Sequence, residues 1–181
     1  MPFSFQQTAL PGVVIVETRV FTDDRGFFME SYKKSEFVGA GLDVEFVQEN
    51  HSRSVRGTLR GLHLQRPPRA QGKLIRVVFG EIFDVAADIR PDSPTYGTWI
   101  SVVLSSENRK SVFIPAGYAH GFCVVSAEAQ VVYKTTDEYA PELEWGVRWD
   151  DPLLAIPWPV HDPCLSERDR RWPLLEQREK T

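Results

Sequence analysis

Short runs of β-branched and aromatic residues dominate this chain, and clusters of glycine, proline and serine interrupt them every few residues. β-Branched and aromatic side chains favour strands, whereas glycine and proline favour the turns between strands. Almost no helical periodicity accompanies these runs. The pattern predicts an all-β fold, either a β-barrel or a double-sheet jelly roll. We expect strands over residues 12–21, 27–30, 44–50, 58–65, 74–79, 81–89, 99–104, 111–114, 121–125 and 130–135.

Helices are predicted only at the periphery of this β-fold. A short helix is expected over 33–40 and a weaker helical turn near 166–171. Beyond residue 140, tryptophans are set among prolines and acids, which predicts a C-terminal wrap that packs aromatic anchors on the barrel. A chain of 181 residues suits one domain. We expect a single domain 1–181 with an N-terminal strand segment at about 1–45, a barrel core at about 46–140 and the aromatic, proline-rich wrap at about 141–181.

The net charge of the chain argues against polyanionic partners. It is −4 at pH 7, so the protein as a whole does not attract nucleic acid. The first residues lack the basic and apolar regions of a signal peptide, and no apolar run approaches the ~18 residues of a membrane span. We therefore expect a cytoplasmic protein with no membrane partner. Cys123 and Cys164 lie far apart without metal-type spacing, which predicts two reduced thiols.

The segment 56–73 places one histidine among several cations and two glycines, within a strand signal. In a regular strand over 58–65, alternation puts His63 and Gln65 on one face and Arg60 on the opposite face. A lone histidine in a strand is more often a surface residue or a satisfied core residue than a catalyst. A catalytic role for His63 therefore needs support from elsewhere in the chain.

A second histidine, His120, ends the sequence Pro-Ala-Gly-Tyr-Ala-His that begins at Pro115. Pro-x-Gly-x-x-His between two strands is the second signature of the cupin jelly roll, in which the turn aims the histidine into the barrel. Metal-binding cupins carry an earlier His-x-His pair, but this chain has His63-Leu64-Gln65 there. A metal site needs three or four donors, so we expect no metal. His63 is then a candidate acid–base group.

Segments of one enzyme family follow in order along nearly the whole chain. They lie at 24–30, 48–52, 59–63, 71–78, 83–90, 114–122, 139–142, 148–152 and 165–169. On these segments the chain resembles the dTDP-4-dehydrorhamnose 3,5-epimerases, which are metal-free cupins that act on a nucleotide-linked 4-keto-6-deoxy sugar. The resemblance implies an isomerase without a cofactor that converts dTDP-4-dehydro-6-deoxyglucose to dTDP-4-dehydrorhamnose.

The resemblance also implies catalytic roles for four side chains. His63 corresponds to the base that removes a proton next to the ketone, and Asp169 orients it and stabilises the imidazolium. Lys73 is similar to the lysine beside the developing oxyanion. Tyr133 matches the tyrosine acid that returns a proton from the opposite face.

Substrate contacts follow from the same resemblance. A diphosphate favours bidentate cations and amide donors, so Arg60, with Gln48 and Asn50, is expected to hold it. His120 and Glu144 are similar to the polar residues that surround the substrate, together with Asp84.

A partner subunit is implied as well. In the family, the segment similar to Arg25, Phe28 and Glu30 reaches the nucleotide of the neighbouring subunit, and an aromatic residue at Tyr139 stacks near the base. We therefore expect a homodimer whose N-terminal strands add to the neighbour's sheet. The strand-forming segment 13–21 would otherwise present an unpaired edge.

Two departures from the family pattern leave the reaction open. Leu64 replaces an aromatic residue, and Trp145 stands where a polar residue is expected. An epimerase of C3 alone or of C5 alone is one alternative, and a metal-dependent cupin oxygenase or isomerase and a non-catalytic nucleotide-sugar-binding jelly roll are two others. The diphosphate role of Arg60 also needs a bulge or twist near Gly61, to bring Arg60 to the face of His63.

Overall fold

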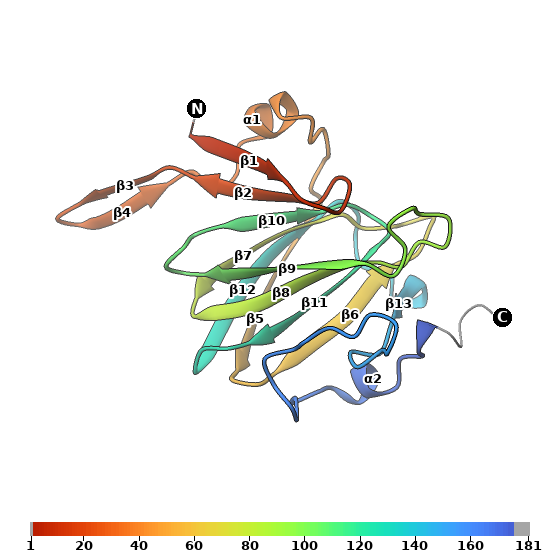
Figure 1. The fold of residues 1–181 in the computed structure, drawn as a ribbon. Coiled ribbons are helices and arrows are strands. Elements are labelled where there is room, and N and C mark those ends of the chain that lie inside the picture. The colour runs from red at the N-terminus through yellow and green to blue at the C-terminus, as the bar shows by residue number, and fades with distance from the viewer. Residues whose placement is uncertain (1, 176–181) are drawn as a thin grey trace.

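Two antiparallel sheets face each other in the computed structural model, which describes residues 2–175 (Figure 1). The first sheet has the order β1 (Phe3–Gln7), β2 (Val14–Thr18), β10 (Ser111–Ile114), β7 (Lys73–Phe79), β12 (Glu128–Thr135) and β5 (Gln48–Val55). The second has the order β13 (Glu144–Gly146), β6 (Leu59–Gln65), β11 (Tyr118–Val124), β8 (Glu81–Asp88) and β9 (Trp99–Ser105). This double sheet is the predicted jelly roll.

The core between the two sheets comes from alternating residues of their facing strands. On β8, Ile82 and Ala86 face this core, whereas Val85 and Ala87 face outward into a second cluster. Ile75 of β7 packs into the same core from the opposite sheet. Both faces of such a strand are buried, one in each cluster. Successive residues are therefore all apolar, and the strand appears in the sequence as a nearly continuous apolar run.

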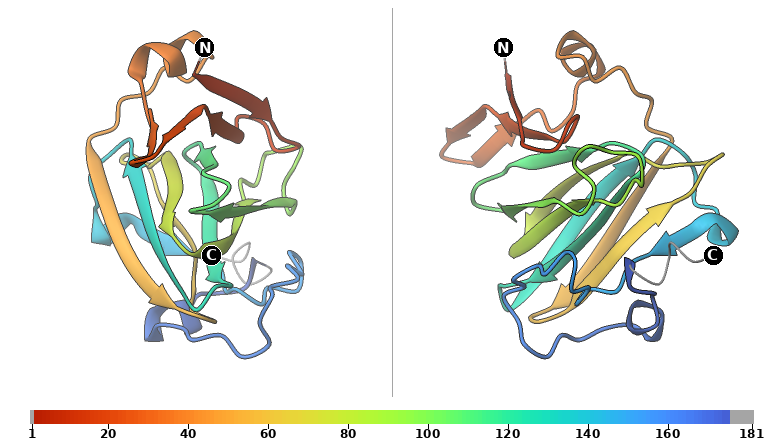
Figure 2. Two further views of the ribbon diagram at one scale, coloured as in Figure 1. Left: turned by 90° about the vertical axis from the view of Figure 1, so that its left-hand side faces the viewer. Right: turned by 45° about the vertical axis from the view of Figure 1, so that its right-hand side comes forward.

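The C-terminal segment covers the outer face of the five-stranded sheet, as predicted for a wrap. Trp158, Leu154 and Val147 are buried there against outward-facing residues of the sheet such as Val85. In Figures 1 and 2 this segment, drawn in blue, crosses the molecule at the end opposite the N-terminal elements. The last residues of the predicted wrap, 176–181, lie outside the described residues.

One N-terminal element, the helix α1 (Lys34–Gly39), packs on the outer face of the six-stranded sheet. This helix, predicted over 33–40, buries Phe37 against Phe3 of β1, with edge-on contacts between the rings. Beyond β2 the chain forms a separate hairpin of β3 (Val20–Asp23) and β4 (Gly26–Met29), which projects from the barrel in Figure 1.

Several predicted strands differ in their limits or partners. The strand expected over 12–21 is interrupted at Arg19, and its first part, β2, pairs with both β1 and β10. The argument that this segment would be an unpaired edge is therefore wrong. β1 and β13 were not predicted, because β1 is half polar and β13 has only three residues. The strand expected over 44–50 begins at Gln48, and that expected over 121–125 begins at Tyr118.

The segments 74–79 and 81–89 do not form the simple hairpin that their spacing around Gly80 suggests. Gly80 has φ +76° and turns the chain from β7 in one sheet to β8 in the other. A Cβ atom there would lie 2.0 Å from the carbonyl oxygen of Glu128, so only glycine fits. Apolar residues of the two strands thus face each other across the core, and alternation within one strand cannot reveal this partner.

The Pro-x-Gly-x-x-His motif makes a second crossing between the sheets. Pro115 to Gly117 connects β10 to β11, and Gly117 has φ +95°. The motif places His120 within β11, at the third residue of the strand, rather than in the turn itself. Among the described residues no helix is long and apolar enough to cross a membrane.

Candidate active site

A cavity of about 600 Å³ opens between the two sheets. It is lined from the six-stranded sheet by β5, β7 and β12, from the five-stranded sheet by β6, β11 and β13, and from the C-terminal segment by residues near α2 (Glu167–Arg170). All the predicted site residues outside the N-terminal segment line this cavity, namely Gln48, Asn50, Arg60, His63, Lys73, His120, Tyr133, Tyr139, Glu144 and Asp169.

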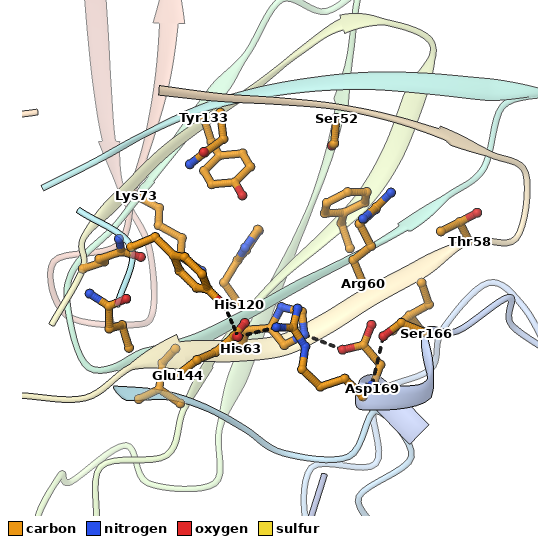
Figure 3. A pocket seen from close by; sticks show the side chains of 18 of the residues that line it. Ser52, Thr58, Arg60, His63, Lys73, His120, Tyr133, Glu144, Ser166 and Asp169 are labelled. Carbon is orange, nitrogen blue, oxygen red and sulfur yellow. Dashed lines mark hydrogen bonds and ion pairs between the residues drawn. The ribbon is translucent and has the colours of Figure 1, made fainter. Parts of the chain in front are cut away.

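His63 and Asp169 form a close pair at one side of the cavity (Figure 3). The Nε2 atom of His63 lies 2.5 Å from Oδ1 of Asp169. Ser166 caps α2 by accepting the backbone N–H of Asp169 at 3.1 Å, which fixes the carboxylate at the first turn. A carboxylate accepts a hydrogen bond, so Nε2 carries the proton and the other ring nitrogen, Nδ1, keeps its lone pair. The neutral imidazole can therefore act as a base at Nδ1.

Burial sets the proton affinity of this pair. It lowers the pKa of His63 below its ordinary value, and the hydrogen bond and charge of Asp169 offset only part of that effect. For Asp169 burial alone would raise the pKa, but the hydrogen bonds from His63 and Ser166 and the nearby charge of Arg168 hold the pKa below its usual value. Near neutral pH the imidazole of His63 is therefore uncharged beside an ionised carboxylate.

Lys73 and Tyr133 reach the cavity from the other sheet, on β7 and β12. Removal from water lowers the pKa of Lys73 to about 8, although the charges of Glu144 and Asp84 oppose the shift. Burial raises the pKa of Tyr133. At neutral pH the cavity thus holds an ammonium group and a protonated phenol. Figure 3 shows His63 and Tyr133 entering the cavity from different strands.

His120 is held by a carboxylate of the neighbouring strand. Its Nε2 atom lies 2.8 Å from Oδ2 of Asp84 on β8, and both side chains are buried. Each histidine of the cavity is therefore paired with one carboxylate. Within residues 2–175 there is no group of three or more histidine, cysteine, aspartate or glutamate side chains arranged to hold a metal ion.

A bulge in β6 brings Arg60 to the face of His63. His63 pairs with His120 and Arg60 with Phe122, so two residues of β6 stand opposite one residue of β11. At Gly61, φ is +123°, and a Cβ atom would lie 2.5 Å from the Cα of Gly121, which excludes any side chain. The prediction that Arg60 and His63 lie on opposite faces is therefore wrong, because the extra residue between them shifts the alternation by one position. The condition for a diphosphate role of Arg60 is met.

A connected set of polar side chains also lines the cavity. The amide of Gln48 donates to Oδ1 of Asn50 at 2.9 Å and accepts the backbone N–H of Tyr139 at 2.8 Å. The hydroxyl of Tyr139 donates to Oε2 of Glu144 at 2.7 Å, and Arg168 pairs with the same oxygen. Arg168 was missed as a site residue. Its position next to Asp169 was the available signal, but only the geometry of α2 shows that both side chains point inward.

Other lining residues also escaped prediction. Ser52 of β5 has a buried hydroxyl with no hydrogen-bond partner among the described residues, and Gln71, Thr58 and Cys164 also line the cavity. Their small polar side chains carry no motif that distinguishes them from strand or turn residues.

The two departures from the family pattern differ in their position. Leu64 lines the cavity, whereas Trp145 packs under the guanidinium of Arg66, 4.7 Å from the ring centre, outside the set of lining residues.

The predicted nucleotide contacts of the N-terminal segment lie on or beside the projecting hairpin and not in the chain's own cavity. Arg25 forms an ion pair with Asp23 at 2.6 Å, and its side chain is 90% exposed. Phe28 is 66% exposed, and Glu30 follows β4 directly. None of the three lines the cavity described above.

This arrangement suits proton transfer next to a carbonyl group. A neutral imidazole and a phenol, which can transfer protons, line one cavity together with an ammonium group, a cation of the kind that stabilises an oxyanion. Comparison with known proteins agrees with that chemistry. A sequence model of the family described as dTDP-4-dehydrorhamnose 3,5-epimerase matches residues 7–177.

Individual relatives match over nearly their whole length. The dTDP-4-dehydrorhamnose 3,5-epimerase of Shigella flexneri is 55% identical over 164 residues, which cover 90% of this chain and 91% of that protein. A crystal structure of dTDP-6-deoxy-D-glucose-3,5-epimerase from Legionella pneumophila Philadelphia 1, in complex with dTDP-4-keto-L-rhamnose, is 45% identical with a TM-score of 0.92, covering 96% of this chain and 93% of that one.

A relative with a narrower reaction has the same fold. The structure of a 3'-monoepimerase from Streptomyces bikiniensis, in complex with dTDP-quinovose, is 35% identical with a TM-score of 0.90 and covers 96% of this chain and 88% of that one. The cupin jelly roll predicted from the sequence is thereby confirmed. The chain belongs to the dTDP-4-dehydrorhamnose 3,5-epimerase family and is an isomerase.

Proposed function

We propose that this chain inverts a dTDP-4-keto-6-deoxy-hexose at C3 and C5, converting dTDP-4-dehydro-6-deoxyglucose to dTDP-4-dehydrorhamnose. The observation that carries the proposal is the meeting of the His63–Asp169 pair with Lys73 and Tyr133 in one cavity. The curated relatives, which are 41% to 56% identical, support double inversion, because they are named as 3,5-epimerases.

The reaction begins at a carbon next to the ketone, whose hydrogen is acidic because the anion delocalises onto the carbonyl oxygen. Nδ1 of His63 takes this proton, and Asp169 stabilises the imidazolium. The ammonium of Lys73 stabilises the enolate oxygen. Tyr133 then gives its phenol proton to the opposite face of the carbon. His63 afterwards loses its extra proton to water and Tyr133 regains one, which resets the site for the second carbon.

The remaining polar residues hold the substrate in this proposal. Arg60 on β6 supplies a guanidinium to the diphosphate, and the amides of Gln48 and Asn50 reach the cavity from β5 of the facing sheet. The ring of Tyr139, whose hydroxyl donates to Glu144, stacks near the thymine base of the nucleotide in this proposal. His120 remains a proposed contact to the sugar.

The decisive experiment is incubation with dTDP-4-keto-6-deoxyglucose in D₂O, followed by NMR. Deuterium at both C3 and C5 is expected. Label at one carbon would identify a mono-epimerase, as in the Streptomyces bikiniensis relative. A substrate that binds but takes up no label would contradict an enzymatic role.

The ionisation of Lys73 predicts the alkaline limb of the pH profile. Because its pKa is about 8, Lys73 loses its positive charge as the pH rises through that value, and kcat/KM is expected to fall with it. Lys73→Met should lower kcat/KM at all pH values and abolish this limb, which a pH–rate profile measures. An unchanged alkaline limb in the variant would show that another group is responsible.

We further propose a homodimer in which Arg25, Phe28 and Glu30 complete the neighbour's site. The support is their exposure on or beside a hairpin that projects from the barrel. Mixing Arg25→Ala with His63→Asn subunits should restore activity that neither variant has alone, since a mixed dimer contains one intact site. A monomer in sedimentation velocity, or no recovery on mixing, would contradict this arrangement.

We also propose that residues 1–181 form one domain, since Leu10 and Val131 share one core cluster and Leu59 and Leu175 share another. The cytoplasm remains the proposed compartment, because Cys123 and Cys164 are free thiols.

A further inference from the structure

Trp172, just beyond α2, contacts the back of the proposed catalytic base. Its ring centre lies 6.2 Å from that of His63 with an interplanar angle of 66°, which is an edge-to-face contact. The ring of Trp145 also packs against Trp172, with the two ring centres 6.4 Å apart. Trp172 itself is not among the residues that line the catalytic cavity. It can therefore act on the reaction only through its neighbours.

A glycine makes room for this indole. Gly146 of β13 pairs directly with His63 of β6. A Cβ atom on Gly146 would lie 2.7 Å from Cε2 of Trp172 and 2.5 Å from the carbonyl oxygen of Leu62. Any side chain at this position would push the indole away from His63. The close approach of Trp172 thus depends on the sequence of a second strand.

Trp172 also lines an outer hollow. That hollow has a volume of about 360 Å³ and is lined by Glu167, Arg168, Arg171 and Trp172. Arg168 lines both spaces, so the two lie close together. The indole therefore borders the outer hollow and also contacts the ring of His63.

We propose that Trp172 is a positioning residue for His63, which holds the imidazole against Asp169 and keeps water from reaching the pair from behind. This inference rests on the proposed role of His63 as the base. The physical reason is that a smaller side chain would join the outer hollow to the cavity and leave one face of the imidazole without a packing partner.

The charged neighbours of His63 determine how the loss of Trp172 would change the pH profile. Asp169 of α2 and Glu144 of β13 favour the imidazolium, Lys73 of β7 disfavours it, and His120 of β11 lies opposite in the strand register. Burial lowers the pKa of His63 more than these charges raise it. Water admitted from behind would weaken that effect, so the pKa would rise toward its ordinary value.

A size series at one position tests the proposal. Trp172→Phe, Trp172→Leu and Trp172→Ala should lower kcat progressively, by roughly tenfold for alanine, with KM within about twofold. The acid limb of kcat/KM should move progressively to higher pH, by up to about one unit. Phenylalanine is the conservative variant, because the indole N–H has no hydrogen-bond partner among the described residues.

Trp158→Phe is the matched control, since Trp158 packs against Phe83 on the far side of the sheet. It should lower the melting temperature without moving the acid limb. An acid limb that stays in place across the Trp172 series would overturn the proposal, and the Phe and Leu variants decide the question if the alanine variant does not fold. His63→Asn, measured alongside, separates this outcome from failure of the base assignment itself, because retained deuterium exchange there would contradict the latter.

Discussion

His63→Asn is expected to lower turnover by on the order of 10³-fold or more and to stop deuterium exchange at both ring carbons. Asparagine preserves the approximate size of the side chain but has no nitrogen lone pair that can take a proton. Asp169 would remain buried without its imidazole partner. The neutral amide of the new asparagine cannot take up the positive charge that the Asp169 carboxylate stabilises on the imidazole. NMR in D₂O with the keto sugar measures both quantities in one experiment.

His51→Asn provides a matched control for this variant. His51 lies on β5, exposed, with its Nε2 atom 3.0 Å from the side-chain oxygen of Gln130, and it does not line the cavity. Its loss should leave exchange unchanged. If the His63 variant binds the substrate and still exchanges both hydrogens at near-normal rates, another residue is the base.

Tyr133→Phe is expected to lower epimerisation by about 10²-fold or more while hydrogen exchange continues. The base remains intact in this variant, so His63 can still remove a proton, exchange it with solvent and return a deuteron to the same face. The opposite face has lost its donor, because the phenol hydroxyl is the only group that the substitution removes. Exchange with retained configuration is therefore the signature of the missing acid.

Product analysis by NMR separates label uptake from inversion. Tyr32→Phe serves as the control, since Tyr32 packs against Phe37 and Phe46 beneath α1, outside the cavity lining. Normal inversion in Tyr133→Phe would show that the proton comes from elsewhere. Loss of exchange together with inversion, in a variant that binds substrate normally, would place Tyr133 on the proton-abstraction side instead.

The sequence predicted which strand residues are buried in the interior, but it did not predict which strands pair with one another. Alternation along the β8 segment reports which residues are buried on each face, because side chains of a strand point to opposite sides. The same alternation cannot show that Gly80 leads into the other sheet. Pairing depends on which distant strand completes the hydrogen bonds, and nothing in the residues 74–89 encodes that partner.

The candidate site shows the same division. The residue types around His63 and His120, with the ordered family segments, were enough to nominate His63, Lys73, Tyr133 and Asp169. Arg168 was missed because the charge of a residue in a short helical turn does not reveal its direction. Trp172 could be identified only as an aromatic anchor, since its contact with His63 joins positions more than a hundred residues apart.

The sequence by itself determined the all-β architecture, because strand and turn signals depend on local backbone preference. The family resemblance of the sequence nominated His63, Lys73, Tyr133 and Asp169 as the acid–base residues, and their roles remain a proposal. Only the tertiary structure decided that Arg60 and His63 share a face, since the bulge at Gly61 arises from its packing against Gly121 on another strand. It also decided that Asp169 and Trp172 both contact His63, which requires the C-terminal segment to fold back across the barrel.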